Sequence, residues 1–124
     1  MFTVYLSHPF TGNEKQNRKE ARNIAKLIVQ YDSDIVVINP LDNFKYTVKA
    51  EMSYDDIIQH ALELMRRADA LVLTGDWMES KGCMQEYTLA KNWGMLIFEE
   101  MKELLSYMLK REDGSLKGYS EKKE

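Results

Sequence analysis

Four short apolar runs alternate with longer stretches of helical period, and this alternation constrains the fold more than any other feature of the chain. The runs are Phe2–Leu6, Ile35–Ile38, Ala70–Thr74 and Met95–Phe98. They are rich in β-branched and aromatic residues, as expected of buried strands. Strands that alternate with helices pair in a parallel sheet with helices on both faces. The sequence therefore predicts an α/β protein.

The stretches between the runs carry apolar residues on one face at helical spacing. They are expected over residues 13–31, 53–68, 80–93 and 99–109. Asn13 with Gln16 resembles a capping box at the start of the first helix. Residues 41–51 are expected to form an irregular connection, the kind of long loop that often lies over a site. This order predicts a flavodoxin-like three-layer sandwich with a four- to five-stranded parallel sheet.

Composition fits one soluble domain over residues 1–109, followed by a charged tail, 110–124, that is expected to be loose unless a partner holds it. The net charge of −3, without a long basic stripe, argues against duplex nucleic acid as a partner. Cys83 is the only cysteine, which excludes an intrachain disulfide and a cysteine-based zinc site. His8 and His60 have no metal-ligand spacing, so no metal and no cofactor are expected.

The apolar opening of the chain is too short for a signal peptide or a membrane span. Together with the single cysteine, this predicts a cytoplasmic protein without membrane association.

Ligands of open parallel sheets bind at the carboxyl ends of the strands. Two loops should therefore meet there, Ser7–Asn13 and Gly75–Ser80. Ser80 can cap the helix that follows, which leaves amides in its first turn that favour an anion. Gly82 has no side chain to keep a ligand away.

Glu86 lies one turn into that helix and shares a face with Cys83, Ala90 and Trp93. A carboxylate on an inward stripe needs a partner or a ligand, because burying it unpaired is costly. The alternative is that Glu86 lies at the edge of the stripe and pairs with a lysine. Spacing alone leaves both interpretations open.

The string Ser80–Glu86 (SKGCMQE), after a strand and Gly75–Trp77, resembles the signature of the nucleoside 2-deoxyribosyltransferase-like superfamily, above all its small bacterial and phage branch. The resemblance covers residues 2–98. It implies that Glu86 is a nucleophile that attacks the anomeric carbon of a deoxyribose. It also implies that Tyr5 fixes one oxygen of this glutamate and leaves the other to attack, the alternative being an ordinary core tyrosine. Family members pair subunits, so a homodimer or larger assembly is implied.

The residue six positions before the glutamate bears on the substrate. It is usually aspartate in the deoxyribosyltransferases and serine in the similar 2′-deoxynucleoside 5′-monophosphate N-hydrolases. Ser80 occupies that position here and favours a 5′-monophosphate, because an aspartate would repel the dianion. Ser7 and Gly12 would offer a hydroxyl and amides to phosphate or sugar. Phe10 would stack on the base or anchor its loop, and Trp77 would wall the base pocket or seal the sheet edge.

One departure from the family pattern concerns the acid that helps the base to leave. The aspartate expected eight positions before Asp69 is Ala61 here. Asp55, Asp56 or His60 would have to stand in as proton donor, His60 being the natural one near neutral pH.

Three functions stay open at this stage. The first is N-glycosidic bond cleavage in a nucleotide, by hydrolysis or base transfer. The second is a non-catalytic nucleotide-binding or regulatory module with the same fold, which the missing acid at position 61 favours. The third is cleavage of another N-ribosyl bond, such as that of NAD.

Overall fold

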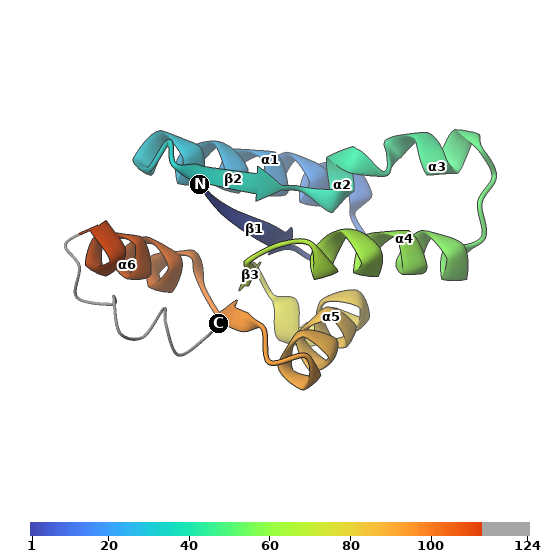
Figure 1. Ribbon diagram of the computed structural model, residues 1–124. Helices are drawn as coiled ribbons and strands as arrows, with labels where there is room; N and C mark the ends of the chain where they lie inside the picture. Colours follow the sequence, from blue (N-terminus) through green and yellow to red (C-terminus); the bar gives the residue numbers. More distant parts are fainter. Residues whose placement is uncertain (113–124) are drawn as a thin grey trace.

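A parallel sheet with strand order β2-β1-β3-β4 runs through the middle of the molecule. The structure, a computed structural model, describes residues 1–112 apart from the side chains of residues 48 and 49 (Figure 1). Its strands are β1 (Phe2–Ser7), β2 (Ile35–Ile38), β3 (Ala70–Leu73) and β4 (Leu96–Phe98). The parallel pairing and the flanking helices confirm the predicted α/β, flavodoxin-like sandwich, with four strands in the sheet.

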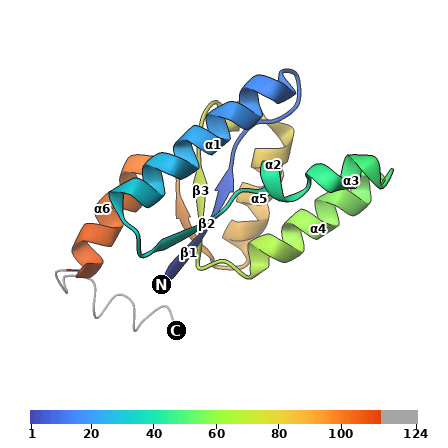
Figure 2. The same cartoon turned by 90° about the horizontal axis from the view of Figure 1, so that it is seen from above.

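Helices cover both faces of the sheet (Figure 2). One face packs against α1 (Glu14–Tyr31) and α6 (Met101–Glu112), whose buried side chains include Ile28 and Leu104. The other packs against α4 (Tyr54–Arg66) and α5 (Lys81–Asn92). Two cores therefore lie on opposite sides of one layer of strands.

The central strand β1 sends alternate side chains into these two cores, as the period of a strand requires. Val4 and Leu6 face α1 and α6. Tyr5 joins the core beneath α4 and α5, beside Leu71 of β3, its partner in the register. Ser7, two residues on, shares the face of Tyr5 at the carboxyl end of the strand. The hydroxyl groups of Tyr5 and Ser7 therefore both point toward α5.

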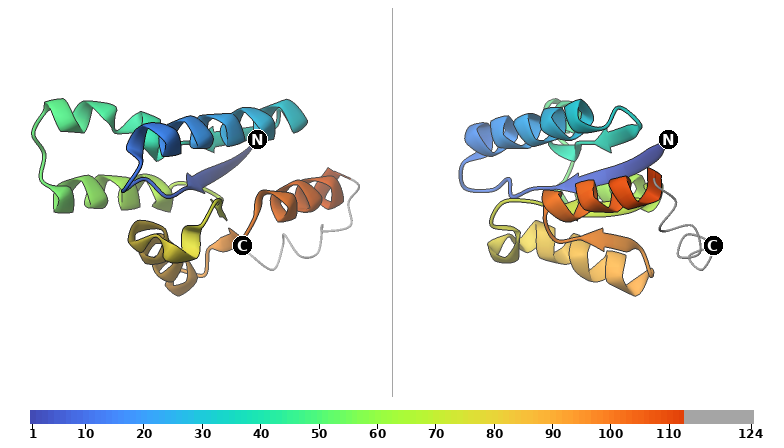
Figure 3. Two further views of the ribbon diagram at one scale, coloured as in Figure 1. Left: turned by 180° about the vertical axis from the view of Figure 1, so that it is seen from behind. Right: turned by 90° about the vertical axis from the view of Figure 1, so that its left-hand side faces the viewer.

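The prediction that residues 41–51 form an irregular connection is wrong in part, because the segment contains two short helices. They are α2 (Pro40–Asn43) and α3 (Lys45–Lys49). Pro40 presets the backbone for the first turn of α2. A salt bridge of 2.8 Å between Arg22 and Asp42 ties α2 to α1. Figure 3 shows the green segment of α3 and the first turns of α4 reaching beyond the strands.

Two helix ends also differ from expectation. Asn13 precedes α1 but its side chain makes no capping bond, and the Gln16 amide donates to Glu20 instead (3.3 Å). The predicted capping box is therefore wrong. The last helix runs to Glu112, beyond the expected end at 109, and in this added turn the Arg111 guanidinium lies over the Phe2 ring at 4.8 Å. The rest of the predicted tail, 113–124, lies outside the described residues.

Candidate active site

A carboxylate from α5 is held by two hydroxyls from β1. The Tyr5 hydroxyl donates to Oε2 of Glu86 at 2.5 Å, and the Ser7 hydroxyl donates to Oε1 at 2.7 Å. Tyr5 and Ser7 are fully buried, whereas Glu86 is half-buried. The inward interpretation of Glu86 is therefore confirmed, and its partners are hydroxyls rather than a lysine.

The charge of Glu86 is opposed by its surroundings. Burial raises the pKa of its carboxyl group, and the hydrogen bonds from Tyr5 and Ser7 only partly offset this. Burial and the adjacent carboxylate together raise the pKa of the Tyr5 phenol well above its usual value. Tyr5 therefore keeps its proton and remains a donor to Glu86 throughout the physiological range.

The two loops that follow β1 and β3 meet beside this carboxylate, as predicted. The backbone amide and the hydroxyl of Thr74 both donate to the Ser7 carbonyl oxygen, each at 3.0 Å. Gly75 adopts φ +64°, and a Cβ there would lie 2.9 Å from Cε1 of His8. Only glycine fits this contact, so the close approach of the loops depends on it.

The first turn of α5 begins next to Glu86. After a 3₁₀ turn, η1 (Trp77–Glu79), the Ser80 hydroxyl accepts a hydrogen bond from the Cys83 amide at 3.2 Å. Ser80 is therefore the N-cap, as predicted. At Gly82 an added Cβ would meet no atom nearer than the Ser80 hydroxyl at 4.0 Å. The backbone there is open to a ligand, and the helix dipole favours an anion.

The aromatic residues assigned to the site have structural roles. Trp77 is 7% exposed, and its ring lies 5.2 Å from that of Tyr87. This favours the interpretation that Trp77 seals the sheet edge. Phe10 is half-buried, its ring lies under the Arg18 guanidinium at 5.3 Å, and its carbonyl accepts from Asn17. These contacts anchor the first loop on α1.

The turn at Gly12 has room for a ligand. Its φ of +103° favours glycine, and nothing lies within 4 Å of a Cβ built there. Among the described residues, Glu86 accepts hydrogen bonds only from Tyr5 and Ser7, and neither Gly12 nor Phe10 donates to it.

A family of proteins described as a domain of unknown function, DUF4406, matches residues 2–99. The chain belongs to this family. No curated protein and no solved structure matches the chain. The range matched to DUF4406 includes all four strands and the three hydrogen-bonded residues Tyr5, Ser7 and Glu86. It ends just before α6.

The proposed proton donors of this DUF4406 protein do not contact Glu86. His60 is exposed on α4, with its ring edge-on to Phe44 at 6.4 Å, and lines a hollow between that ring and α4. Asp56 is exposed in the first turn of the same helix. Ala61 is buried in the position where the resemblance calls for an acid. The structure therefore unites Tyr5, Ser7 and Glu86 but not a second acid.

Sequence reasoning assigned Ser7 to the substrate and overlooked His8 as a site residue. The Ser7 hydroxyl is taken by Glu86, a role that the two-residue period of β1 could have revealed. The buried His8 ring contacts Thr74 and Glu20, which are 66 and 12 residues away. No local pattern in the sequence signals these contacts.

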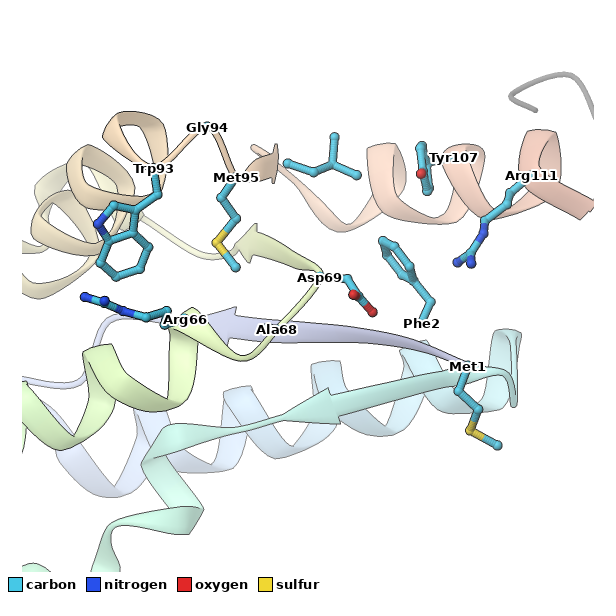
Figure 4. A pocket seen from close by; sticks show the side chains of 11 residues that line it. Met1, Phe2, Arg66, Ala68, Asp69, Trp93, Gly94, Met95, Tyr107 and Arg111 are labelled. Atoms are coloured by element: carbon cyan, nitrogen blue, oxygen red, sulfur yellow. The ribbon is translucent and has the colours of Figure 1, made fainter. Parts of the chain in front are cut away.

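A hollow of about 580 Å³ lies at the opposite, amino ends of the strands. Figure 4 shows Arg66 beside Trp93 at one end of it, Arg111 with Phe2 at the other, and Asp69 between them. This hollow holds no buried carboxylate or nucleophile. We therefore place the candidate chemistry at the carboxyl ends of the strands, where ligands of such sheets bind.

Residues 1–112 contain no group of three or more His, Cys, Asp or Glu side chains arranged to hold a metal ion. Within the same range, no helix has both the length and the apolar character needed to cross a membrane.

Proposed function

We propose that this DUF4406 protein cleaves the N-glycosidic bond of a nucleotide, most simply a 2′-deoxynucleoside 5′-monophosphate, by hydrolysis or base transfer. The observation that carries the proposal is the Glu86 carboxylate, held by two hydroxyls beside the open first turn of α5. The resemblance of residues 80–86 to the deoxyribosyltransferase signature supports the same reaction.

In the proposed reaction, Glu86 attacks the anomeric carbon. The bond from this carbon to the base nitrogen breaks as a bond to a Glu86 oxygen forms, and the base leaves with the bonding electrons and takes up a proton. Water or a second base then releases the sugar from the covalent intermediate. Tyr5 and Ser7 orient the carboxylate, which reacts through a remaining lone pair because each oxygen accepts only one hydrogen bond.

The proton for the departing base is assigned to His60, with Asp56 as the alternative. Both lie on α4, which begins near the carboxyl ends of the strands because it runs antiparallel to them. Neither touches Glu86, so this step requires the substrate to span the distance between α4 and α5.

The phosphate of the substrate is assigned to the first turn of α5. Gly82 leaves the backbone amides accessible, and Ser80 adds a hydroxyl without adding negative charge. Gly12 would contribute its amide, and the half-buried Phe10 would contact the base. Trp77 would support the base pocket from beneath rather than line it.

The assembly and the location of the protein remain part of the proposal. The resemblance implies a homodimer or larger assembly, and the single cysteine with the short apolar opening favours a cytoplasmic location. Light scattering coupled to size-exclusion chromatography tests the assembly.

The experiment that tests the reaction compares the wild type with Glu86→Gln and with Glu14→Gln, a matched change at an exposed carboxylate in the first turn of α1. Each protein is incubated with the four 2′-deoxynucleoside 5′-monophosphates and with the corresponding nucleosides, and released base is separated by chromatography. We expect release from a monophosphate by the wild type and Glu14→Gln and none by Glu86→Gln. Failure of the wild type to release any base would overturn the proposal.

A second candidate is a non-catalytic nucleotide-binding module. Two observations favour it: the buried Ala61 leaves the site without a second acid, and both Glu86 oxygens already have partners. A monophosphate would then raise the melting temperature of wild type and Glu86→Gln alike, without turnover.

A further inference from the structure

His8 lies just past β1 and is buried between three elements. Its Nδ1 is 2.8 Å from the Thr74 hydroxyl at the end of β3, and its Nε2 is 3.0 Å from Oε2 of Glu20 on α1. The His8 side chain is 3% exposed, whereas the Glu20 side chain is 46% exposed. Such a buried polar ring, bonded on both nitrogens, joins the two loops of the site to a helix on the opposite face of the sheet.

The direction of these hydrogen bonds follows from the donors available. The Thr74 hydroxyl has one proton, which it gives to the Ser7 carbonyl oxygen at 3.0 Å. Its lone pairs remain available to accept from Nδ1 of His8. The Glu20 carboxylate only accepts, so Nε2 is the donor in that hydrogen bond. The His8 ring is therefore bonded to its neighbours through both nitrogens.

The chain of contacts leads directly to Glu86. His8 holds the Thr74 hydroxyl, Thr74 holds the carbonyl of Ser7, and the Ser7 hydroxyl donates to Oε1 of Glu86. The His8 ring also fills the space above Gly75, where a Cβ would collide with it. These contacts hold the backbone from which the Ser7 hydroxyl reaches Glu86.

We propose that His8 is a positioning residue for Glu86. Its ring, hydrogen-bonded through both nitrogens, clamps the Ser7 segment between Thr74 and Glu20. The effect on turnover rests on the proposed function of Glu86, whereas the effect on the Glu86 carboxylate does not. This role lies outside the reaction itself, since His8 touches Thr74 and Glu20 rather than Glu86.

The charges around the ring are consistent with this role. Glu20 on α1 is the charged group in contact with His8, and its own second oxygen accepts from Gln16. From the other packed elements, Thr74 and Gly75 contribute no charge, and Asp76 beyond them is exposed. The hydrogen bond from His8 lowers the pKa of Glu20, as expected for a carboxylate paired with a donor.

The test follows the Glu86 carboxyl group by carbon-13 NMR across a pH titration, with its signal assigned by its absence in Glu86→Gln. His8→Phe keeps an aromatic ring but removes both nitrogens. Loss of the Ser7 hydrogen bond removes an interaction that lowers the pKa of Glu86, so its titration should move to higher pH. Ser7→Ala should move it in the same direction, and His8→Asn, which keeps a donor near the Nδ1 position, should restore part of the wild-type value.

Turnover provides the second readout. We expect His8→Phe to lower kcat roughly 10-fold, with little change in KM, because the carboxylate is misplaced while the substrate contacts persist. The acid limb of the rate profile should move to higher pH together with the titration. Glu14→Gln removes an exposed carboxylate from the first turn of α1 that does not bond to His8. This variant should leave both readouts at their wild-type values.

The outcomes separate the two proposals. If Ser7→Ala moves the Glu86 titration but His8→Phe does not, His8 only fills space and the inference is overturned. If the wild type has no activity, the proposed function fails, yet the titration still decides the role of His8. If His8→Phe does not fold, Glu20→Gln takes its place, because Glu20 is the exposed partner of His8. This variant should move the Glu86 titration to higher pH by less than Ser7→Ala does. An unchanged Glu86 titration would contradict the inference.

Discussion

The ionised Glu86 carboxylate lowers the stability of the folded protein, because burial opposes its negative charge. Burial raises the pKa of its carboxyl group, so the folded state binds a proton more tightly than the unfolded chain. The contribution of Glu86 to stability is therefore greatest at acid pH and is lost as the pH rises through the folded pKa. A carboxyl group whose pKa is raised by burial is a candidate for an active site.

Glu86→Gln should remove this penalty. The amide keeps an oxygen that can accept from Tyr5 and an NH₂ group that can donate to the Ser7 hydroxyl. We expect the variant to melt a few degrees above the wild type at pH 7–8 and to lose this advantage below about pH 4, where glutamate is protonated in both states. Melting curves over pH 4–8 test this. A variant that is less stable than the wild type at pH 8 would contradict it.

The residues of the site differ in how far the sequence could predict them. Tyr5 and Glu86 were paired through the resemblance, and the hydrogen bond between them confirms the pairing. Ser7 was assigned to a ligand because its position after a strand suggests an open hydroxyl, whereas the alternation of β1 turns it inward. His8 has no such pattern, since its partners come from α1 and from the end of β3.

At the scale of elements, Ser80 serves α5 in two ways that one substitution can separate. Its hydroxyl caps the helix by accepting from the Cys83 amide, a bond worth about 1 kcal/mol. Aspartate is an equally good cap, but its charge would repel a phosphate at the same helix end.

Ser80→Asp should therefore retain the wild-type free energy of unfolding while the KM for a monophosphate rises at least about 10-fold, equivalent to 1.4 kcal/mol of lost binding. Ser80→Ala is the complementary variant and should lose about 1 kcal/mol of stability with a smaller effect on KM. Urea unfolding and initial rates measure the two quantities. Equal KM values for wild type and Ser80→Asp would contradict the assignment of the substrate phosphate to the first turn of α5.

The elements that the sequence predicted well are those whose own pattern fixes them. The four strands follow from their apolar runs, and α4 follows from its apolar stripe and the Ser53 cap. The helices α2 and α3 are too short to show a stripe, and α2 depends on Pro40 and on the tertiary contact of Asp42 with Arg22. Local reasoning therefore predicts a loop where packing makes helices.

At the scale of the whole molecule, the sheet separates the site from half of the core. Tyr5, Ser7 and Glu86 lie on the face covered by α4 and α5. The core beneath α1 and α6 lies on the other face, and His8, through Glu20, provides a polar link from the site to α1. Damage to the far core should therefore cost stability without reaching the carboxylate.

Two matched leucines test this separation. Leu104 lies in the core beneath α6, and Leu71 lies beside Tyr5 in the core beneath α5, both fully buried. Each change to alanine should cost roughly 2–5 kcal/mol in the free energy of unfolding, because each leaves a cavity. Only Leu71→Ala should also shift the Glu86 titration, since only that cavity lets Tyr5 move away from Oε2. An equal shift in Leu104→Ala would show that the sheet transmits the disturbance and that the two cores act as one.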